Sequence, residues 1–379
     1  MVSWGGEMLR QSGFLICVVV ALLSIGLVEL YSATAISSDF RQADSLFFFK
    51  KQVLWTLFSI VALLIAAQVP LSLWSRMRVP LLIFTFVLLA LVYIPGIGEE
   101  RNGSRRWLDL GGWLFQPSEM AKLTLCIFLC SYVTEKPDRL KRFFSGFLPT
   151  FGLLLTACLM IAFQRDIGTA IFIGTVLGVT LIVAGVRWVH MIPAFAVTAP
   201  PFAIYCITQM SHVQSRISTW LHPEADPLGQ GHQVTQSLIA LGSGGLWGEG
   251  LGQGTQKLFF LPEVHADFLF PIIGEELGFA GTLGILGLYV LLGFAGWRIS
   301  KRASSPFGFL LSFALTTHIL LQAAINIAVT TALVPAKGIP LPLLSYGGSS
   351  LLFTMVGIGI LVRIAGEEER GATPESQEV

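Results

Sequence analysis

Residues 14–33 read FLICVVVALLSIGLVELYSA, a run of mostly apolar residues. A helix of about 20 apolar residues is long enough to cross the hydrocarbon core of a bilayer. The run follows Arg10 and precedes Ala33-Thr34-Ala35, a pattern that resembles a signal-peptidase site. Its length exceeds the roughly 7 to 15 apolar residues of a signal peptide, so we interpret it as a retained membrane span.

The composition of the 379-residue chain agrees with a membrane protein. Apolar residues make up 54% of the chain and charged residues 12%, which is about half the roughly 25% usual in soluble domains. The net charge of +1 lacks the surplus of cations that nucleic-acid binding requires, so we expect no nucleic-acid partner. The five cysteines are odd in number and all lie in apolar runs, which predicts neither a disulfide framework nor a metal site.

Nine further apolar runs follow the first, and together they predict an all-α polytopic membrane protein with ten transmembrane helices. We treat residues 1–366 as a single transmembrane domain and residues 367–379 as a disordered cytoplasmic tail. The ten predicted spans are 14–33, 52–69, 79–97, 118–134, 145–163, 167–186, 188–208, 267–297, 306–334 and 342–364.

The connections between the spans indicate the orientation of the chain. With a cytoplasmic N-terminus, the short inner connections are richer in Lys and Arg per residue than the outer ones, so we place both termini in the cytoplasm. Two outer connections, 98–117 and 209–266, are too long to be simple turns. The second carries much apolar surface, and we expect it to fold back onto the membrane with a short helix near Val234 to Leu241.

Charged residues at the ends of two spans are candidates for function, because a charge inside a bilayer is costly unless it is paired or faces water. Glu119 and Lys122 are three residues apart, so they lie on one helical face and can pair; the alternative is a boundary pair that snorkels to the interface. Arg165 and Asp166 occupy a tight turn, where adjacent opposite charges are often simply solvated.

A third group of charges lies around the start of the eighth span. Asp267 follows His265 and Pro262, so its carboxylate should lie near the outer boundary; alternatively it is an acidic helix-start residue that complements the helix dipole. Glu275 and Glu276 lie roughly 12 Å deeper at about 1.5 Å per residue. Two adjacent acids at that depth cannot both face lipid, so we expect at least one to face a cavity or a cation.

Two further segments could contribute to a site on the outer side. Arg105, Arg106 and Trp107 could engage a phosphate and a lipid headgroup, or could act only as an interfacial anchor. Ser345 lies in the stretch PLPLLSYGGSS at 340–350, whose small residues and prolines also suit close helix packing.

Eight short motifs occur in order along the chain: NGSRRWLDL (102–110), QPSEMAKL (116–123), DPLG (226–229), QS (236–237), GSGGL (242–246), LPEVHAD (261–267), GEELG (274–278) and LSYGGSS (344–350). In this order they resemble the SEDS family, the polytopic proteins of bacterial shape, elongation, division and sporulation. Residues 256–262 and 335–338, QKLFFLP and PAKG, are more similar to the FtsW/SpoVE branch than to the RodA branch.

The resemblance implies a ten-helix peptidoglycan glycosyltransferase that polymerises lipid II outside the cytoplasmic membrane during cell division. It implies a class B penicillin-binding protein and other divisome proteins as partners, and Asp267 as the catalytic residue. A divalent cation, Mg or Mn, could assist. The residues expected to bind substrate are Glu119, Lys122, Arg105, Arg106, Trp107, Arg216, Asp166, His265, Glu275 and Ser345.

The chain departs from the family pattern at Ala266, where Thr is common, at His232, where Tyr is usual, and at Arg165, where Pro commonly precedes the Asp. Arg165 could pair with Asp166 and so lessen a catalytic role for that acid.

The expected reaction is an inverting transfer in which Asp267 acts as general base on the 4-hydroxyl of the acceptor sugar. Undecaprenyl diphosphate leaves, with its tail in lipid between helices, and cations stabilise its charge. The available cations are Lys122, Arg105, Arg106 and Arg216.

A lipid II flippase or transporter would use the same helices and buried charges, and a non-catalytic scaffold for the transpeptidase is a third alternative. A carrier needs a site near the membrane midplane, whereas most of the charges here are predicted near the outer face.

Overall fold

In the computed structural model, the described residues are 8–42, 44–101, 103–109, 111, 113–135, 137–140, 142–223, 229–257 and 267–371. A helix of this described part lies in each of the ten segments predicted to span the membrane. These helices are α1 (Met8–Gln42), α2 (Phe47–Gln68), α4 (Arg78–Leu91), α5 (Pro117–Glu135), α7 (Leu148–Phe163), α8 (Ile167–Val183), α9 (Trp188–Gln209), α12 (Leu269–Arg302), α13 (Pro306–Thr330) and α14 (Gly348–Gly371).

Seven helices of the described residues are long and apolar enough to cross a membrane. These are α1, α2, α9, α12, α13, α14 and the helical stretch Phe143–Phe163, in which the π-helix η1 (Phe143–Phe147) continues into α7. α4 and α8 are shorter apolar helices. α5 carries Glu119, Lys122 and Glu135, and nearly all of its residues are buried. It is the central helix, because α4, α7, α8, α13 and α14 all contact it.

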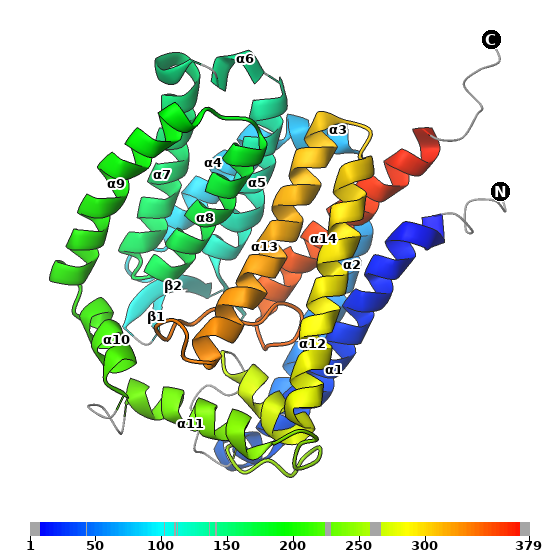
Figure 1. The fold of residues 1–379 in the computed structure, drawn as a ribbon, viewed down its shortest axis with the longest axis vertical. Helices are drawn as coiled ribbons and strands as arrows, with labels where there is room; N and C mark the ends of the chain where they lie inside the picture. Colours follow the sequence, from blue (N-terminus) through cyan, green and yellow to red (C-terminus); the bar gives the residue numbers. More distant parts are fainter. Residues whose placement is uncertain are drawn as a thin grey trace.

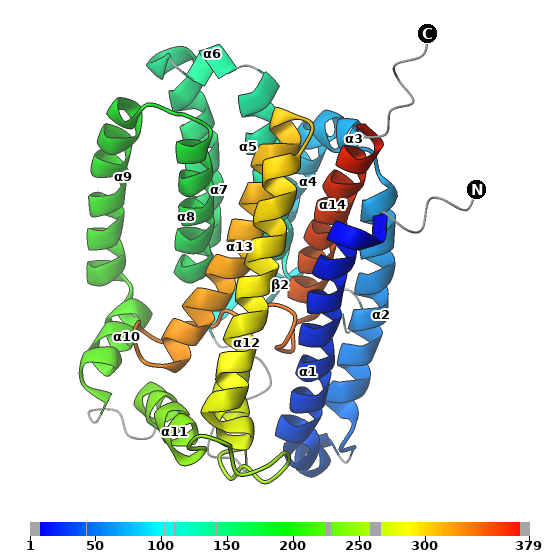
Figure 2. The ribbon, with the colours of Figure 1, turned by 45° about the vertical axis from the view of Figure 1, so that its right-hand side comes forward.

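The long helices run side by side, so that the start of α1 and the end of α14 lie at the same end of the molecule (Figure 1). The short helices α3 (Leu71–Arg76) and α6 (Pro137–Leu140) also lie at that end. The opposite end carries the strands together with α10 (Ser211–Leu221) and α11 (Gln230–Ser243), and we call it the sheet end (Figure 2). α11 confirms the short helix expected near Val234 to Leu241.

Close helix contacts depend on glycine at two positions. A Cβ atom added at Gly359 of α14 would lie 2.5 Å from the Leu63 carbonyl oxygen of α2, and one at Gly296 of α12 would lie 2.1 Å from the Thr316 hydroxyl of α13. Small residues let helix backbones approach closely in membrane proteins, where the apolar effect between helices is weak. The α2–α14 and α12–α13 pairs therefore form the tightly packed part of the bundle.

The connection 98–117 contains a small antiparallel sheet, so the fold is not purely helical. β1 (Gly98–Arg101), β2 (Ser104–Asp109) and β3 (Leu114–Phe115) pair in that order. The β1–β2 register shifts between Glu99 and Glu100, so that Arg105 lies opposite Glu100 and Trp107 opposite Glu99, with Arg106 as the extra residue between them.

The last helix differs from its predicted bounds at both ends. It begins at Gly348 rather than 342, because Pro340, Pro342 and the glycine pair at 347–348 keep the preceding chain irregular. It continues to Gly371, so residues 367–371 of the expected tail are helical. Residues 372–379 lie outside the described part of the chain.

Candidate active site

Asp267 lies two residues before the start of α12 at the sheet end, and it is half-buried. The Asn326 side-chain amide on α13 donates to the Asp267 carbonyl oxygen at 2.9 Å and to the Ile339 carbonyl oxygen at 2.8 Å. This one amide therefore ties Asp267 to the α13–α14 connection, residues 331–347. A Cβ atom at Gly338 would lie 2.9 Å from the Asp267 carboxylate, so glycine allows this connection to approach the acid closely.

Asp166, a second carboxylate, caps the N-terminus of α8 and is buried. It accepts hydrogen bonds from the Thr169 backbone N–H and the Gln116 side-chain amide, both at 3.2 Å. The Arg106 guanidinium lies 3.8 Å from the same carboxylate. Asp166 is thus held by the sheet, by α8 and by the residue preceding α5.

The Arg165 guanidinium does not form the ion pair with Asp166 that the sequence allowed. It donates to the Gly103 carbonyl oxygen at 2.6 Å instead. The backbone φ of Arg165 is 62°, in the left-handed region that non-glycine residues rarely adopt, and this conformation goes together with a side chain directed to the sheet. Asp166 therefore has Arg106 as its ion-pair partner.

Two more cations complete this site. Arg216 on α10 is close enough to Arg106, Asp166 and Asp267 for their charges to act on it; burial and Arg106 lower the pKa of Arg216, and the two acids oppose that shift. The Lys337 side chain lies over the start of α8, where a Cβ atom at Gly168 would be 1.8 Å from the Lys337 Cε atom. We call Arg106, Asp166, Arg216, Asp267 and Lys337 the carboxylate–cation cluster.

Lys337 was not among the residues selected from the sequence. Burial lowers the pKa of Lys337 to about 8; Asp166 opposes the shift and Arg216 adds to it. The PAKG motif that contains this lysine served only to assign the branch of the family. The sequence does contain a signal for Lys337, since it is the single charged residue in the stretch 303–362.

Glu119 and Lys122 form the predicted ion pair at 2.7 Å, inside the protein rather than at its boundary. Their side chains are 6% and 3% exposed, which rules out the snorkelling alternative. Lys122 also donates to the Gln322 side-chain oxygen at 3.1 Å. At about 1.5 Å per residue, Lys122 lies roughly 9 Å along α5 from Gln116, deeper in the bundle than the carboxylate–cation cluster.

Three further sequence candidates, Arg105, Trp107 and Ser345, are not part of the carboxylate–cation cluster. Arg105 is exposed and pairs with Glu100 of β1 at 3.2 Å, away from Asp166. Trp107 is half-buried on β2, opposite Glu99. Ser345 is buried, and its hydroxyl accepts from the Leu341 backbone N–H at 3.1 Å. His265 lies outside the described residues.

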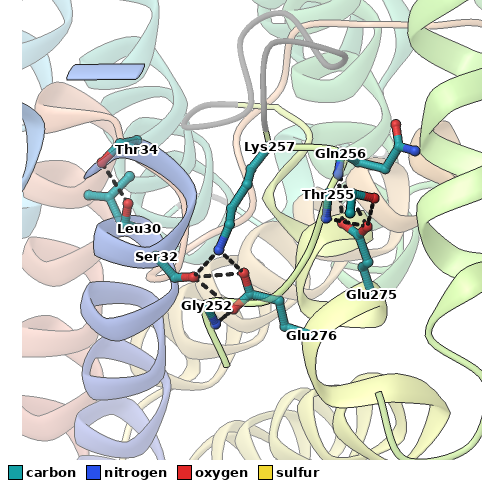
Figure 3. Close-up of polar contacts among 9 residues, drawn as sticks. All are labelled: Leu30, Ser32, Thr34, Gly252, Thr255, Gln256, Lys257, Glu275 and Glu276. Carbon is teal, nitrogen blue, oxygen red and sulfur yellow. Dashed lines mark hydrogen bonds and ion pairs between the residues drawn. The ribbon is translucent and has the colours of Figure 1, made fainter. Parts of the chain in front are cut away.

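Glu275 and Glu276 are fully buried, and one of them has the cationic partner that the sequence argument required. The Lys257 ammonium lies 2.7 Å from the Glu276 carboxylate. Glu275 instead accepts hydrogen bonds from Thr255 and Gln256 (Figure 3). Both carboxylates thus contact the segment that follows α11.

An apolar groove lies between α7, α8 and α9. Its α8 wall begins at Ala170, one turn after Asp166, and continues to Leu181. The groove therefore leads from the carboxylate–cation cluster along the length of α8. Its wall includes Phe151, Gly174, Leu177, Phe195 and Phe202.

A site for the expected divalent cation does not emerge from this chemistry. Among the described residues, no three His, Cys, Asp or Glu side chains are grouped so that they could hold a metal ion. Asp166 and Asp267 lie among three cations, which compete for carboxylate oxygens that a metal would need. These residues do not fit an Mg or Mn site, and the metal stays a prediction from the resemblance.

The chain was compared with known protein families and with curated proteins. A family described as "Cell cycle protein", which groups FtsW, RodA and SpoVE, matches residues 13–370. The probable peptidoglycan glycosyltransferase FtsW of Trichlorobacter lovleyi is 39% identical over 93% of this chain and 92% of its own length. The stage V sporulation protein E of Bacillus subtilis is 40% identical over 93% of this chain and 96% of its own.

Solved structures give the same fold. A chain from a peptidoglycan synthase complex that coordinates polymerisation and crosslinking has a TM-score of 0.75 at 26% identity, covering 93% of this chain and 97% of the other. The rod shape determining protein RodA of Thermus thermophilus has a TM-score of 0.68 at 25% identity, covering 96% and 98%. The arrangement of helices is therefore common to this chain and to these proteins.

Proposed function

The chain belongs to the FtsW, RodA and SpoVE family of cell cycle proteins and is a peptidoglycan glycosyltransferase of the division type; on this premise we propose that Asp267 is its general base. The observation that supports this role is the carboxylate–cation cluster. It places a half-buried carboxylate beside Arg216 and the Lys337–Gly338 turn, so a proton acceptor and the cations for a diphosphate share one site.

The reaction proceeds as an inverting displacement. Asp267 takes the proton of the acceptor 4-hydroxyl as its oxygen attacks the anomeric carbon of the donor lipid II. The bond from that carbon to the diphosphate breaks, and undecaprenyl diphosphate leaves with the electron pair. Arg106, Arg216 and Lys337 stabilise the leaving charge, since guanidinium and ammonium groups are strong donors to phosphate oxygens. Asp166 orients Arg106 and the start of α8.

The roles of the other substrate-binding candidates follow from their positions. Trp107 lies next to Arg106 on β2 and would contact the sugar or headgroup region. Arg105 would act at the edge of the site, and Ser345 would hold the α13–α14 connection through its hydrogen bond from Leu341. The Glu119–Lys122 pair would support the site from deeper in the bundle. The polyprenyl tail would occupy the apolar groove between α7, α8 and α9, which begins one turn from Asp166.

We also propose that the helices of all ten predicted spans cross the membrane, the shorter α4 and α8 included, with both termini in the cytoplasm and the sheet end outside. The clustering of α10, α11 and the sheet at one end supports this orientation, together with the Lys- and Arg-rich connections at the other. A class B penicillin-binding protein would bind as the crosslinking partner, which is supported by the likeness to a chain of a peptidoglycan synthase complex. We propose division proteins as further partners and the division septum as the site of action, and the similarity to FtsW proteins supports both.

The experiment that tests this function is reconstitution with lipid II. The purified protein and its cognate transpeptidase are expected to convert lipid II into glycan polymer that a muramidase digests. The transporter alternative predicts a different result: no polymer, and movement of labelled lipid II across the liposome bilayer. That outcome would show that the protein is a lipid II carrier and not a glycosyltransferase.

The alkaline side of the pH profile should depend on Lys337. As the pH rises through about 8, Lys337 loses its proton and its positive charge, so diphosphate binding weakens. We expect kcat/KM, which reports ionisations of the free enzyme, to fall above about pH 8. Lys337→Arg should keep kcat/KM level to about pH 10, because arginine stays charged. An unchanged alkaline limb in this variant would remove Lys337 from diphosphate binding.

A further inference from the structure

α12 is interrupted eleven residues after Asp267, and the glycine-rich segment, residues 244–257, takes over its hydrogen bonds there. Gly278 has φ 67° and ψ −166°, outside the helical region. In an unbroken helix each N–H bonds to the carbonyl four residues earlier. Here two amides and two carbonyls of α12 exchange those partners for the glycine-rich segment. The bonds run from Phe279 N–H to Gly245 O (2.9 Å), Ala280 N–H to Leu246 O (3.1 Å), Glu249 N–H to Glu275 O (2.9 Å) and Gly250 N–H to Glu276 O (3.0 Å).

The Glu276 carboxylate strengthens this junction by binding three groups from two other segments, the glycine-rich segment and α1 (Figure 3). It accepts from the Gly252 backbone N–H at 2.8 Å, from the Lys257 ammonium at 2.7 Å and from the Ser32 hydroxyl of α1 at 2.7 Å. Lys257 also donates to Ser32 at 3.1 Å. Charge-assisted hydrogen bonds in a buried environment are strong, so α1, α12 and the glycine-rich segment are held together at one point.

The Glu275 carboxylate holds the same segment between Gly252 and Lys257. It accepts from the backbone N–H groups of Thr255 and Gln256 at 2.8 and 3.1 Å, and from the Thr255 hydroxyl at 3.0 Å (Figure 3). A Cβ atom at Gly254 would lie 2.8 Å from the same carboxylate, so only glycine lets the backbone come this close. With its oxygens occupied in this way and no exposed surface, Glu275 has little capacity left for substrate.

Asp267 lies between the two ends of this junction along the chain. The chain leaves the junction at Lys257 and returns to it at Glu275, two turns into α12. The helical residues 269–275 connect Asp267 rigidly to Glu275, and Asn326 holds the Asp267 carbonyl from the other side. The direction of the Asp267 carboxylate is therefore coupled to how α12 is held.

We propose that Glu275 and Glu276 are positioning residues, which fasten the glycine-rich segment to α12 and α1 and thereby fix the geometry of Asp267. The inference rests on the proposed role of Asp267 as general base. A displacement of about 1 Å at a reacting group can cost about 10²-fold in rate, so a loosened junction should lower turnover without changing lipid II affinity.

The test uses the full-length protein with its transpeptidase and compares three variants. Thr255→Val removes one hydrogen bond to Glu275, Glu276→Gln removes the charge that pairs with Lys257, and Gln253→Ala changes an exposed side chain of the same segment as a control. Two quantities are measured for each: kcat and KM for lipid II, and hydrogen exchange across residues 267–275. Thr255→Val is the variant that keeps the test sound if Glu276→Gln does not fold.

We expect Thr255→Val and Glu276→Gln to lower kcat by about tenfold or more with KM unchanged, and to speed hydrogen exchange across 267–275, while Gln253→Ala matches the parent. Parental exchange and parental kcat in Thr255→Val would overturn the inference and leave the glycosyltransferase assignment intact. If the parent protein makes no polymer but the variants still exchange faster across 267–275, the role of the junction is supported and the proposed glycosyltransferase function is refuted.

Discussion

Replacing Asp267 with asparagine should lower the rate of lipid II polymerisation by about 10³-fold, since general base catalysis contributes roughly 10² to 10⁴. Asparagine has the size of aspartate but cannot accept a proton from the acceptor hydroxyl. The backbone contact from Asn326 involves the Asp267 carbonyl and not its side chain, so the variant should keep the local fold. The measurement is the initial rate of polymer formation by the purified complex.

Two controls separate a chemical defect from a structural one. Asp109→Asn removes an exposed acid from β2 at the same end of the protein, and it should polymerise at the parental rate. Lipid II binding should survive in Asp267→Asn, since Arg106, Arg216 and Lys337 remain. A folded Asp267→Asn complex that polymerises as fast as the parent would exclude Asp267 as the general base.

The helices and one ion pair could be predicted because their signals are local. About 20 apolar residues in a row favour a membrane helix whatever surrounds them, and helices lie in all ten predicted segments of the described chain. Glu119 and Lys122 share a helical face by their spacing of three residues, so their contact required no knowledge of the rest of the fold.

The features that the sequence did not predict depend on contacts between distant segments. Lys337 enters the candidate site because residues 331–347 lie against the start of α8, about 170 residues earlier in the chain. β1 and β2 are rich in charged residues and short, so they lack the apolar alternation that predicts strands. The glycines at 244–254 permit a close backbone contact, but nothing in the sequence predicts that the segment replaces hydrogen bonds of α12.

Breaking the buried Glu119–Lys122 pair should have the largest effect on stability. Lys122→Met leaves the Glu119 carboxylate inside the bundle without its cation, and removing one partner of a buried pair typically costs about 3 to 5 kcal/mol. We expect a loss of about 3 kcal/mol in the free energy of unfolding, measured by chemical unfolding in detergent micelles. The matched control is Lys50→Met, which breaks the exposed Lys50–Asp44 pair at 2.9 Å and should cause no measurable change.

The double variant Glu119→Gln/Lys122→Met decides whether this cost comes from the uncompensated charge or from lost packing. A neutral glutamine needs no cation, so the double variant should regain most of the stability that Lys122→Met loses. If both variants are equally unstable, the lost packing of the Lys122 ammonium, which lies 5.3 Å from the centre of the Phe172 ring, would carry the effect. Recovery of stability without recovery of polymerisation would instead show that the pair, although it lies below the carboxylate–cation cluster, acts on catalysis through its charge.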